Sequence, residues 1–302
     1  MTAYILPATG SETTLAIVAE TVPGVTPATP TTLLLPAVKI DLELTKATFP
    51  DTSIQGDRME HFLASGISKV SGSFTGNLSH SNFAPLLQTA MFGLFATKVL
   101  KTGKVLNTVT FEEWHNDISL GFVYNGCFCD KLALKFPLTG FVTLDGTIAG
   151  QNMTTETTQL ATPTPAVVET PYTMVTATLK EGGTTIALLT TVDITVDNGA
   201  TAIEVLGGAY PVGYTPGMSK ITGTISGVIT NATLMNKFLN QTASSIEVQV
   251  TDGTNTLDFN MPNVFYTGMK KSVSGQGAVA FSMPFNALKD STSGSNLIIT
   301  ES

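Results

Sequence analysis

The side chains that could do chemistry are few and lie far apart along the chain. The densest group is Glu112-Glu113-Trp114-His115-Asn116-Asp117, whose carboxylates and imidazole are types used in acid–base catalysis. No nucleophile motif or glycine-rich phosphate loop accompanies it, so a solvated loop or an interface anchor is the favoured interpretation. A glycan hydrolase would need two carboxylates that converge in a cleft, and no pair is marked. We therefore predict no catalytic residue and no enzyme activity.

Metal-binding side chains show no ligand spacing. His61, His80 and His115 lie in separate segments, and Cys127 and Cys129 stand two apart with only a distant histidine. On a strand, two residues at this spacing leave the same face, which is a poor geometry for a disulfide. We predict buried free thiols, no metal site and no cofactor.

Composition points to self-assembly. Of the 302 residues only 13% are charged while 42% are hydrophobic, so the chain has trouble covering its surface unless much of it meets another protein. The net charge of −8 argues against a nucleic-acid binder, which needs Lys and Arg to neutralise phosphates. No basic leader with an apolar core opens the chain and no apolar run is long enough to span a membrane. We expect a soluble product made in the cytoplasm, with no membrane partner.

The chain repeats itself. Ile67–Leu78 returns as Met218–Ile229 at a spacing of 151 residues, and Leu134–Gly140 resembles Met269–Gly275 at a spacing of 135. A unit near half the chain is too long for a solenoid module and indicates two tandem duplicated domains. We place the first at 1–155, a Thr/Pro-rich linker at 156–171 and the second at 172–302.

Each half follows one order of elements. Thr and Gly are abundant and the apolar runs are short, so the fold class is mainly β. An alternating strand opens each half at 38–44 and 192–197, a long irregular segment follows at 45–66 and 198–217, and the repeated strand then leads into a short helix near 83–92 or 234–239. Asn125-Gly126 and Asp252-Gly253 predict hairpin turns.

The polar faces of these strands carry acidic residues, namely Asp41, Glu43, Asp145, Asp193 and Asp197. The long segment at 45–66 carries the charged residues Asp57, Arg58 and Glu60, and loops of this length inside compact domains usually have a function.

Taken in order, several short segments resemble one family. They are Gly10–Pro27, an apolar strand with a Glu-Thr and a Gly/Thr/Pro turn; Gln55-Gly56-Asp57-Arg58 ahead of the repeated strand; the Phe83–Phe92 helix; and Gly126-Cys127 leading to Gly140-Phe141-Val142-Thr143. Their order and spacing are similar to those of the tail tube proteins of long-tailed bacteriophages, the siphophage-like major tail proteins. The second half departs from this pattern, because Gly208-Ala209 stands where the first half has Asp57-Arg58.

The resemblance implies a structural virion protein. Its fold would be a β-sandwich with a flanking helix in each half, and sheets of neighbouring subunits would join into a β-barrel ring around a lumen. Rings of these two-domain subunits, as trimers with pseudo-sixfold symmetry or as hexamers, would stack into the tail tube that delivers the genome. The lumen-facing candidates would then be Asp41, Glu43, Asp145, Asp193 and Asp197, whose like charge would repel DNA phosphate and keep transit fast, with outer solvent as the open alternative. The candidate contact between rings would be the long loop at 45–66, through Asp57, Arg58 and Glu60. Its partners would be further copies of itself, the tape measure, tail tip and tail terminator proteins, and passing DNA. The alternative is a β-sandwich binding, adhesion or tail decoration module, which would form a small oligomer of fixed size.

Overall fold

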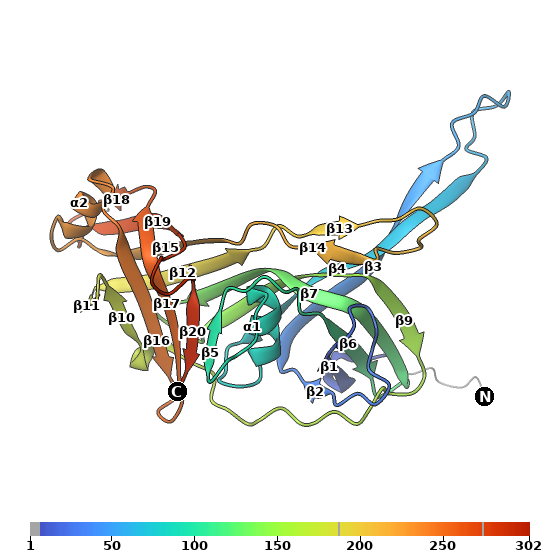
Figure 1. Cartoon of the computed structure of the whole chain (residues 1–302), viewed down its shortest axis with the longest axis horizontal. Helices are drawn as coiled ribbons and strands as arrows, with labels where there is room; N and C mark the ends of the chain where they lie inside the picture. Colours follow the sequence, from blue (N-terminus) through green and yellow to red (C-terminus); the bar gives the residue numbers. More distant parts are fainter. Residues whose placement is uncertain (1–6, 187, 274) are drawn as a thin grey trace.

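The structure is a computed structural model that describes residues 7–186, 188–273 and 275–302. Antiparallel strands dominate the described chain, and two short helices, α1 (Ala84–Met91) and α2 (Thr233–Leu239), flank them (Figure 1). The first half contains η1 (Gly10–Glu12), β1 (Thr13–Ala19), β2 (Leu33–Leu34), β3 (Ala37–Pro50), β4 (Leu63–Asn77), β5 (Val99–Lys101), β6 (Val109–His115), β7 (Leu120–Phe136), β8 (Thr143–Gly150) and β9 (Asn152–Glu156). The second half contains η2 (Met174–Thr176), β10 (Thr178–Glu181), β11 (Thr184–Thr185), β12 (Leu189–Asp197), β13 (Thr201–Ile203), β14 (Gly213–Thr215), β15 (Lys220–Val228), β16 (Ser244–Thr251), β17 (Thr256–Tyr266), β18 (Lys270–Ser272), β19 (Ala280–Ala287) and β20 (Ile298–Glu301).

One long sheet layer runs through both halves. Its strands lie in the order β3, β4, β8 and β7 from the first half, then β12, β15, β19 and β18 from the second. The halves join where Lys131–Phe136 of β7 pair with Val192–Asp197 of β12. The two halves are therefore parts of one continuous structure, and the sheet of a single chain is open at both ends.

Alternation along the repeated strands places one face of this layer in the core. Val70, Phe74 and Leu78 are buried, as are Ile221 and Ile225 at the matching positions of the second half, while the alternate residues, such as Ser71 and Ser73, face the other way. Beneath the layer lie α1 and the strands β1 and β6 in the first half, and β16, β17 and β20 in the second (Figure 1). The apolar side chains between these layers form the hydrophobic core.

Gly72 allows β3 and β4 to approach closely. Its φ is +153°, and a Cβ at this position would lie 2.1 Å from the backbone oxygen of Asp41. A side chain at residue 72 would therefore push the two strands apart.

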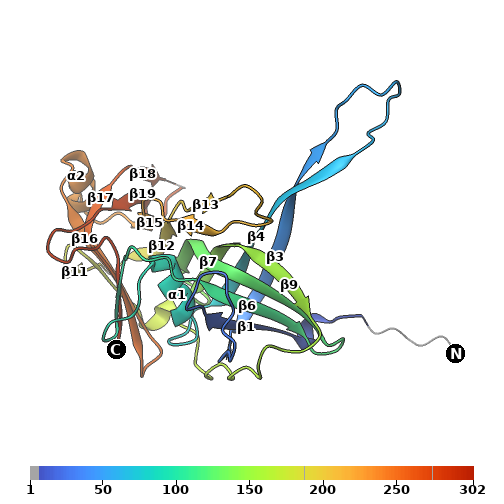
Figure 2. The same ribbon diagram turned by 45° about the vertical axis from the view of Figure 1, so that its right-hand side comes forward.

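The expected irregular segments contain strands. Residues 45–50 and 63–66 belong to β3 and β4, which extend past the body as a two-stranded arm with 51–62 at its tip (Figure 2). The 198–217 segment contains the small β13–β14 hairpin. The irregular interpretation agrees with the remaining residues of both segments but was wrong for these strand residues, because a ladder with no buried face has no hydrophobic period to reveal it.

The two predicted turns differ in outcome. Asp252-Gly253 lies in the turn between β16 and β17, as expected. Asn125-Gly126 lies inside β7, where the register with β6 shifts, so the hairpin prediction there was wrong. Gly126 adopts a φ of 65°, and the positive φ that suits a turn serves a β-bulge here.

Residues 157–171, within the expected linker, form no strand or helix but are tied to the first half. Asn82 exchanges two hydrogen bonds with Val167, donating from Nδ2 at 3.0 Å and accepting at Oδ1 at 2.9 Å. Glu169 accepts hydrogen bonds from the backbone N–H and the hydroxyl of Ser81. The segment thus packs as part of the first half before the chain enters β10.

Candidate functional site

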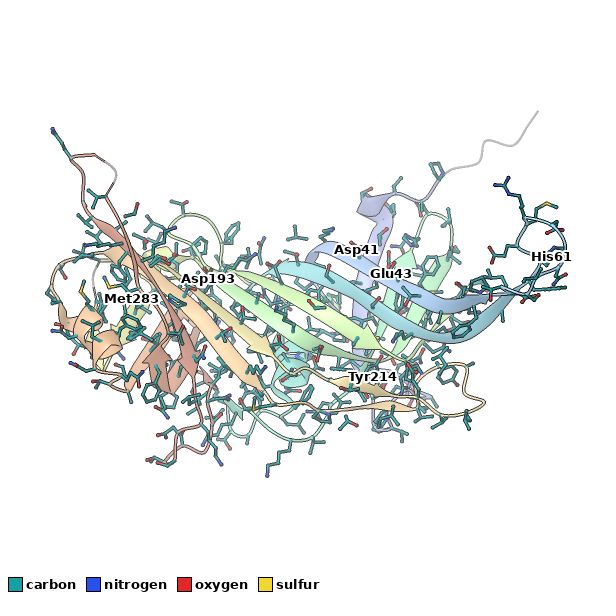
Figure 3. The ribbon with its side chains drawn as sticks, turned by 90° about the horizontal axis from the view of Figure 1, so that it is seen from above. Asp41, Glu43, His61, Asp193, Tyr214 and Met283 are labelled. Carbon is teal, nitrogen blue, oxygen red and sulfur yellow. The ribbon has the colours of Figure 1, made fainter. Side chains whose placement is uncertain are left out.

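The five acidic candidates gather on the polar face of the long sheet layer. Residues opposite each other in an antiparallel ladder share a face. The register aligns Asp41 with Ser73, Ser73 with Thr147 and Thr147 with Lys131, and the same row continues to Asp197 and Lys220. Glu43, Asp145 and Asp193 occupy neighbouring rows of this face. Figure 3 labels Asp41 and Glu43 on β3 and Asp193 on β12. The structure therefore brings together residues that are up to 156 positions apart in sequence.

Lysines accompany these carboxylates, which the sequence argument did not consider. Lys39 lies 3.4 Å from Asp41, and Lys135 Nζ lies 2.6 Å from an oxygen of Asp145. Partial burial works against the charge of Asp145, but hydrogen bonds from Lys135 and Thr75 outweigh it and lower the pKa of this carboxyl. The face is therefore polar, rich in Ser and Thr, and nearly balanced in charge rather than uniformly acidic.

The arm carries the three loop candidates at its tip. Asp57, Arg58 and Glu60 are all exposed, as is the neighbouring His61, which Figure 3 places at the outer end of the molecule. Asp57 accepts hydrogen bonds from the backbone N–H of Met59 at 3.0 Å and pairs with His61 Nε2 at 2.9 Å, and these contacts lower the pKa of Asp57. The tip is thus shaped by its own polar contacts.

The arm also exposes large apolar side chains. Ile54 is fully exposed and Met59 is 72% exposed, and the other exposed apolar residues of the arm are Phe49, Phe62 and Leu63. Exposed apolar side chains grouped on a projecting element mark a surface that meets another molecule. Sequence reasoning selected the charged residues of this loop and missed the apolar ones beside them.

Two strand edges at opposite ends of the sheet layer are unpaired within the described chain. The only ladder partner of β3 there is β4, and that of β18 is β19. The internal β7–β12 junction indicates how such edges could join. β3 pairs with β4 in the same way that β12 pairs with β15, so β3 is the counterpart of β12 in the first half. Unpaired edges invite pairing with another chain, so they belong to the candidate site.

The ladder registers define which positions of the two halves correspond. Glu43 of β3 pairs with Ser71 of β4, and Thr195 of β12 pairs with Thr222 of β15. Ser71 and Thr222 occupy the same position of the sequence repeat, so Glu43 corresponds to Thr195. Lys270 pairs with Ser282 as Ala133 pairs with Asp145. Lys270 therefore corresponds to Ala133, whereas the sequence repeat aligns Lys270 with Lys135. This difference of two residues accompanies the register shift between Cys129 and Lys131 in β7.

The acid–base group does not converge on one point. It lies mostly on strand β6 rather than on a loop, so Glu112 and Glu113 point to opposite faces. Glu112 is buried, accepts the backbone N–H of Leu160 at 2.7 Å and has its pKa raised by burial. Glu113 lies 3.6 Å from His115, whose Nδ1 contacts the hydroxyl of Thr13 at 2.8 Å. These contacts hold β6 to β1 and to the segment around Leu160.

The remaining chemical candidates lie apart. Cys127 and Cys129 are free and buried, as predicted, and burial raises the pKa of both thiols. Across residues 7–186, 188–273 and 275–302, no three His, Cys, Asp or Glu side chains group as metal ligands. In the same residues no helix has the length and apolar character needed to cross a membrane.

Sequence reasoning also missed a buried polar network beneath α2. Lys237 Nζ lies 2.8 and 2.7 Å from the two carboxylate oxygens of Glu181, and 2.9 Å from the hydroxyl of Ser244. Tyr266 donates to the same carboxylate at 3.1 Å. Glu181 is only 5% exposed, so this network holds α2 against β10 and β17. No local sequence signal marks the pair, which is 56 residues apart.

The family model described as "Phage tail tube protein" matches residues 10–287, which is most of the chain. The search of curated proteins found no match.

Proposed function

This chain belongs to the phage tail tube protein family, and from that premise we propose that its copies join edge to edge into rings that stack as a tube for the genome. The observation that carries the proposal is the open sheet layer with one free edge on β3 and the other on β18. Joining such edges between copies removes both and leaves no ladder exposed.

The internal junction supplies a register for the seam between copies. Thr195 of β12 lies opposite Ala133 of β7, and these positions correspond to Glu43 and Lys270. A seam that repeats the junction therefore places Glu43 of one copy opposite Lys270 of the next. An acidic and a basic residue directly across an antiparallel ladder stabilise the pairing.

We assign the polar face to the lumen. The opposite face of the layer already covers the hydrophobic core, so only the polar face is available to line a channel. Asp41, Glu43, Asp145, Asp193 and Asp197 would then face passing DNA. Because lysines lie among them, we expect a weak net field and a surface to which phosphate does not adhere.

We assign the arm to contact between rings. It projects beyond the body that would form the ring (Figure 2) and presents Asp57, Arg58 and Glu60 beside exposed apolar side chains. Burial of these apolar groups against the next ring would favour stacking, and a heterologous contact of this kind propagates as a filament.

The parallel order of elements in the two halves supports tandem duplication. Three such subunits would give a ring with pseudo-sixfold symmetry, and this number is part of our proposal. The tube would end against tail tip and tail terminator proteins and surround the tape measure protein. The protein would be made in the host cytoplasm and reside in the virion tail, in a structural rather than catalytic role.

The experiment is assembly of the protein purified alone, followed by electron microscopy and sedimentation velocity. The proposal predicts hollow particles of variable length. A small oligomer of fixed size that never lengthens, even when seeded with tail tips, would favour the alternative of a binding, adhesion or tail decoration module.

A further inference from the structure

The second half contains an apolar groove that no part of the described chain fills. It lies between α2, the end of β15 and the start of β19, with a volume of about 450 Å³. Its lining includes Ile229, Thr230, Leu234, Met235, Phe281 and Met283. None of the residues of α2 is buried, whereas most of α1 is. The helix of the second half thus lacks the cover that its counterpart has.

The matching place in the first half is covered by the segment Val167–Tyr172. The repeat spacing of 151 makes Leu78 the counterpart of Ile229, and the ladders make Val142 the counterpart of Val279. Tyr172 lies between Leu78 and Val142: its N–H donates to the Leu78 carbonyl at 2.9 Å, and its carbonyl accepts from Val142 N–H at 2.8 Å. The Tyr172 side chain is completely buried.

The second half has the same backbone arrangement without the inserted residue. Ile229 N–H donates to the Val279 carbonyl at 2.9 Å, as Leu78 N–H donates to Val142 at 2.8 Å. Within the described chain, no hydrogen bond reaches the Ile229 carbonyl or the Val279 N–H. The Ile229 carbonyl and the Val279 N–H therefore lie beside the apolar groove in the same arrangement as the two groups that Tyr172 joins in the first half.

The sequence offers a second segment of the covering type. Pro171-Tyr172-Thr173 comes directly before η2 and β10, and Pro7-Ala8-Thr9 comes directly before η1 and β1. Thr173 and Thr9 both have extended backbone, and they occupy the N-cap positions of η2 and η1. The segment that leads into one half thus covers the half before it, and the N-terminal segment leads into the first half in the same way.

We propose that the groove binds residues 1–8 of a neighbouring copy as an extended segment that pairs with Ile229 and Val279. Within one chain β1 begins at the end of the body opposite α2 (Figure 1), and Met283 marks the groove at the far end from the arm in Figure 3. Asp117 holds Thr9 within its own chain, and the eight residues before Thr9 can reach at most about 28 Å when extended. Tyr4, Ile5 and Leu6 supply apolar side chains for the groove. The inference rests on the proposed ring and names one of its contacts.

The first test removes residues 2–6. The contacts of Thr9 with Asp117, at 2.6 Å from the backbone N–H and 3.1 Å from the hydroxyl, remain in this variant. We therefore expect the subunit to keep its melting temperature while the concentration needed for assembly rises tenfold or more. A truncated protein that assembles at the wild-type concentration would overturn the inference.

The second test places single cysteines in separate chains. Leu6→Cys and Thr230→Cys proteins are mixed, assembled and oxidised, and the native thiols stay silent because both are buried. We expect a covalent dimer of one chain of each kind. The matched control pairs Thr230→Cys with Met59→Cys at the arm tip, where no dimer is expected. Cross-linking to Met59 in place of Leu6 would make the arm the occupant and contradict the inference.

These outcomes separate the two proposals. Wild-type protein that never forms tubes would refute the ring itself. Tubes that form without the Leu6–Thr230 cross-link, and equally well from truncated chains, would refute only the N-terminal contact.

Discussion

Reversal of one charge at the proposed seam tests whether neighbouring copies join as β7 joins β12. In the Glu43→Lys protein a lysine would lie opposite Lys270 of the next copy. A cross-strand charge pair contributes about 0.2–1 kcal/mol, and like charges cost a similar amount, so the change amounts to about 0.4–2 kcal/mol per seam. Each added subunit makes one seam, so the concentration of unassembled protein at equilibrium should rise about 2–30-fold.

The assay is pelleting of tubes followed by measurement of the soluble fraction. Lys270→Glu alone should raise the soluble fraction to a similar degree, and the double variant Glu43→Lys/Lys270→Glu should restore wild-type assembly because the pair is only exchanged. Lys289→Glu serves as the matched control, since Lys289 is exposed but lies outside the seam. High salt should shrink all these differences. Single effects that simply add in the double variant would refute the register, since residues that do not meet show no coupling.

Other predictions concern stability and stacking. Burial, with Glu247 nearby, raises the pKa of Asp258 from 3.8 to about 6. The protonated carboxyl is therefore the favoured form in the fold, and its contribution to stability is full below about pH 4 and is lost as pH rises through 6. Because solvent screens this partly exposed group, Asp258→Asn should raise the unfolding free energy at pH 7.5 by about 1–2 kcal/mol and change it little at pH 4. Chemical denaturation at the two pH values checks this, and an equal gain at both would contradict it. Lys237→Met leaves the Glu181 carboxylate buried without its cation and should lower the unfolding free energy by about 3 kcal/mol in the same measurement. Adding Glu181→Gln should recover part of this loss. A Lys237→Met protein of wild-type stability would contradict the role of the network. Gly72→Ala should lower the melting temperature by several degrees because its Cβ meets the backbone of β3, and an unchanged melting temperature would mean that the strands separate without cost. Phe62→Asp at the arm should leave rings but shorten or abolish tubes in electron micrographs, and normal tubes would exclude the arm from stacking.

The sequence was sufficient to predict the elements that have one buried face. The alternation of Val70 and Phe74 in β4, and of Ile221 and Ile225 in β15, follows directly from the period of a half-buried strand. The short helices expected near 83–92 and 234–239 are present as α1 and α2, and Pro85 lies in the first turn of α1, where its missing N–H removes no helical hydrogen bond. The matching Ser-Lys-x-x-Gly patterns revealed which strands correspond between the halves.

The arm, the bulge and the junction depend on information that no local window contains. The arm strands have polar and apolar residues exposed on both faces, so no period distinguishes them from a loop. Asn125-Gly126 becomes a bulge rather than a turn because β7 continues through it and pairs with β6 and β9. The β7–β12 pairing joins residues about 60 positions apart, and the contact of Lys135 with Asp145 follows only from the register of β7 with β8.

The most direct measurement of the central claim is an electron cryomicroscopy map of tubes assembled from this protein alone, at a resolution that separates strands. The account predicts a continuous sheet in which β3 of each copy pairs with β18 of the next, Glu43 lies opposite Lys270, and the polar face lines the lumen. A map in which β3 stays unpaired, or in which the polar face turns to the outside, would contradict it.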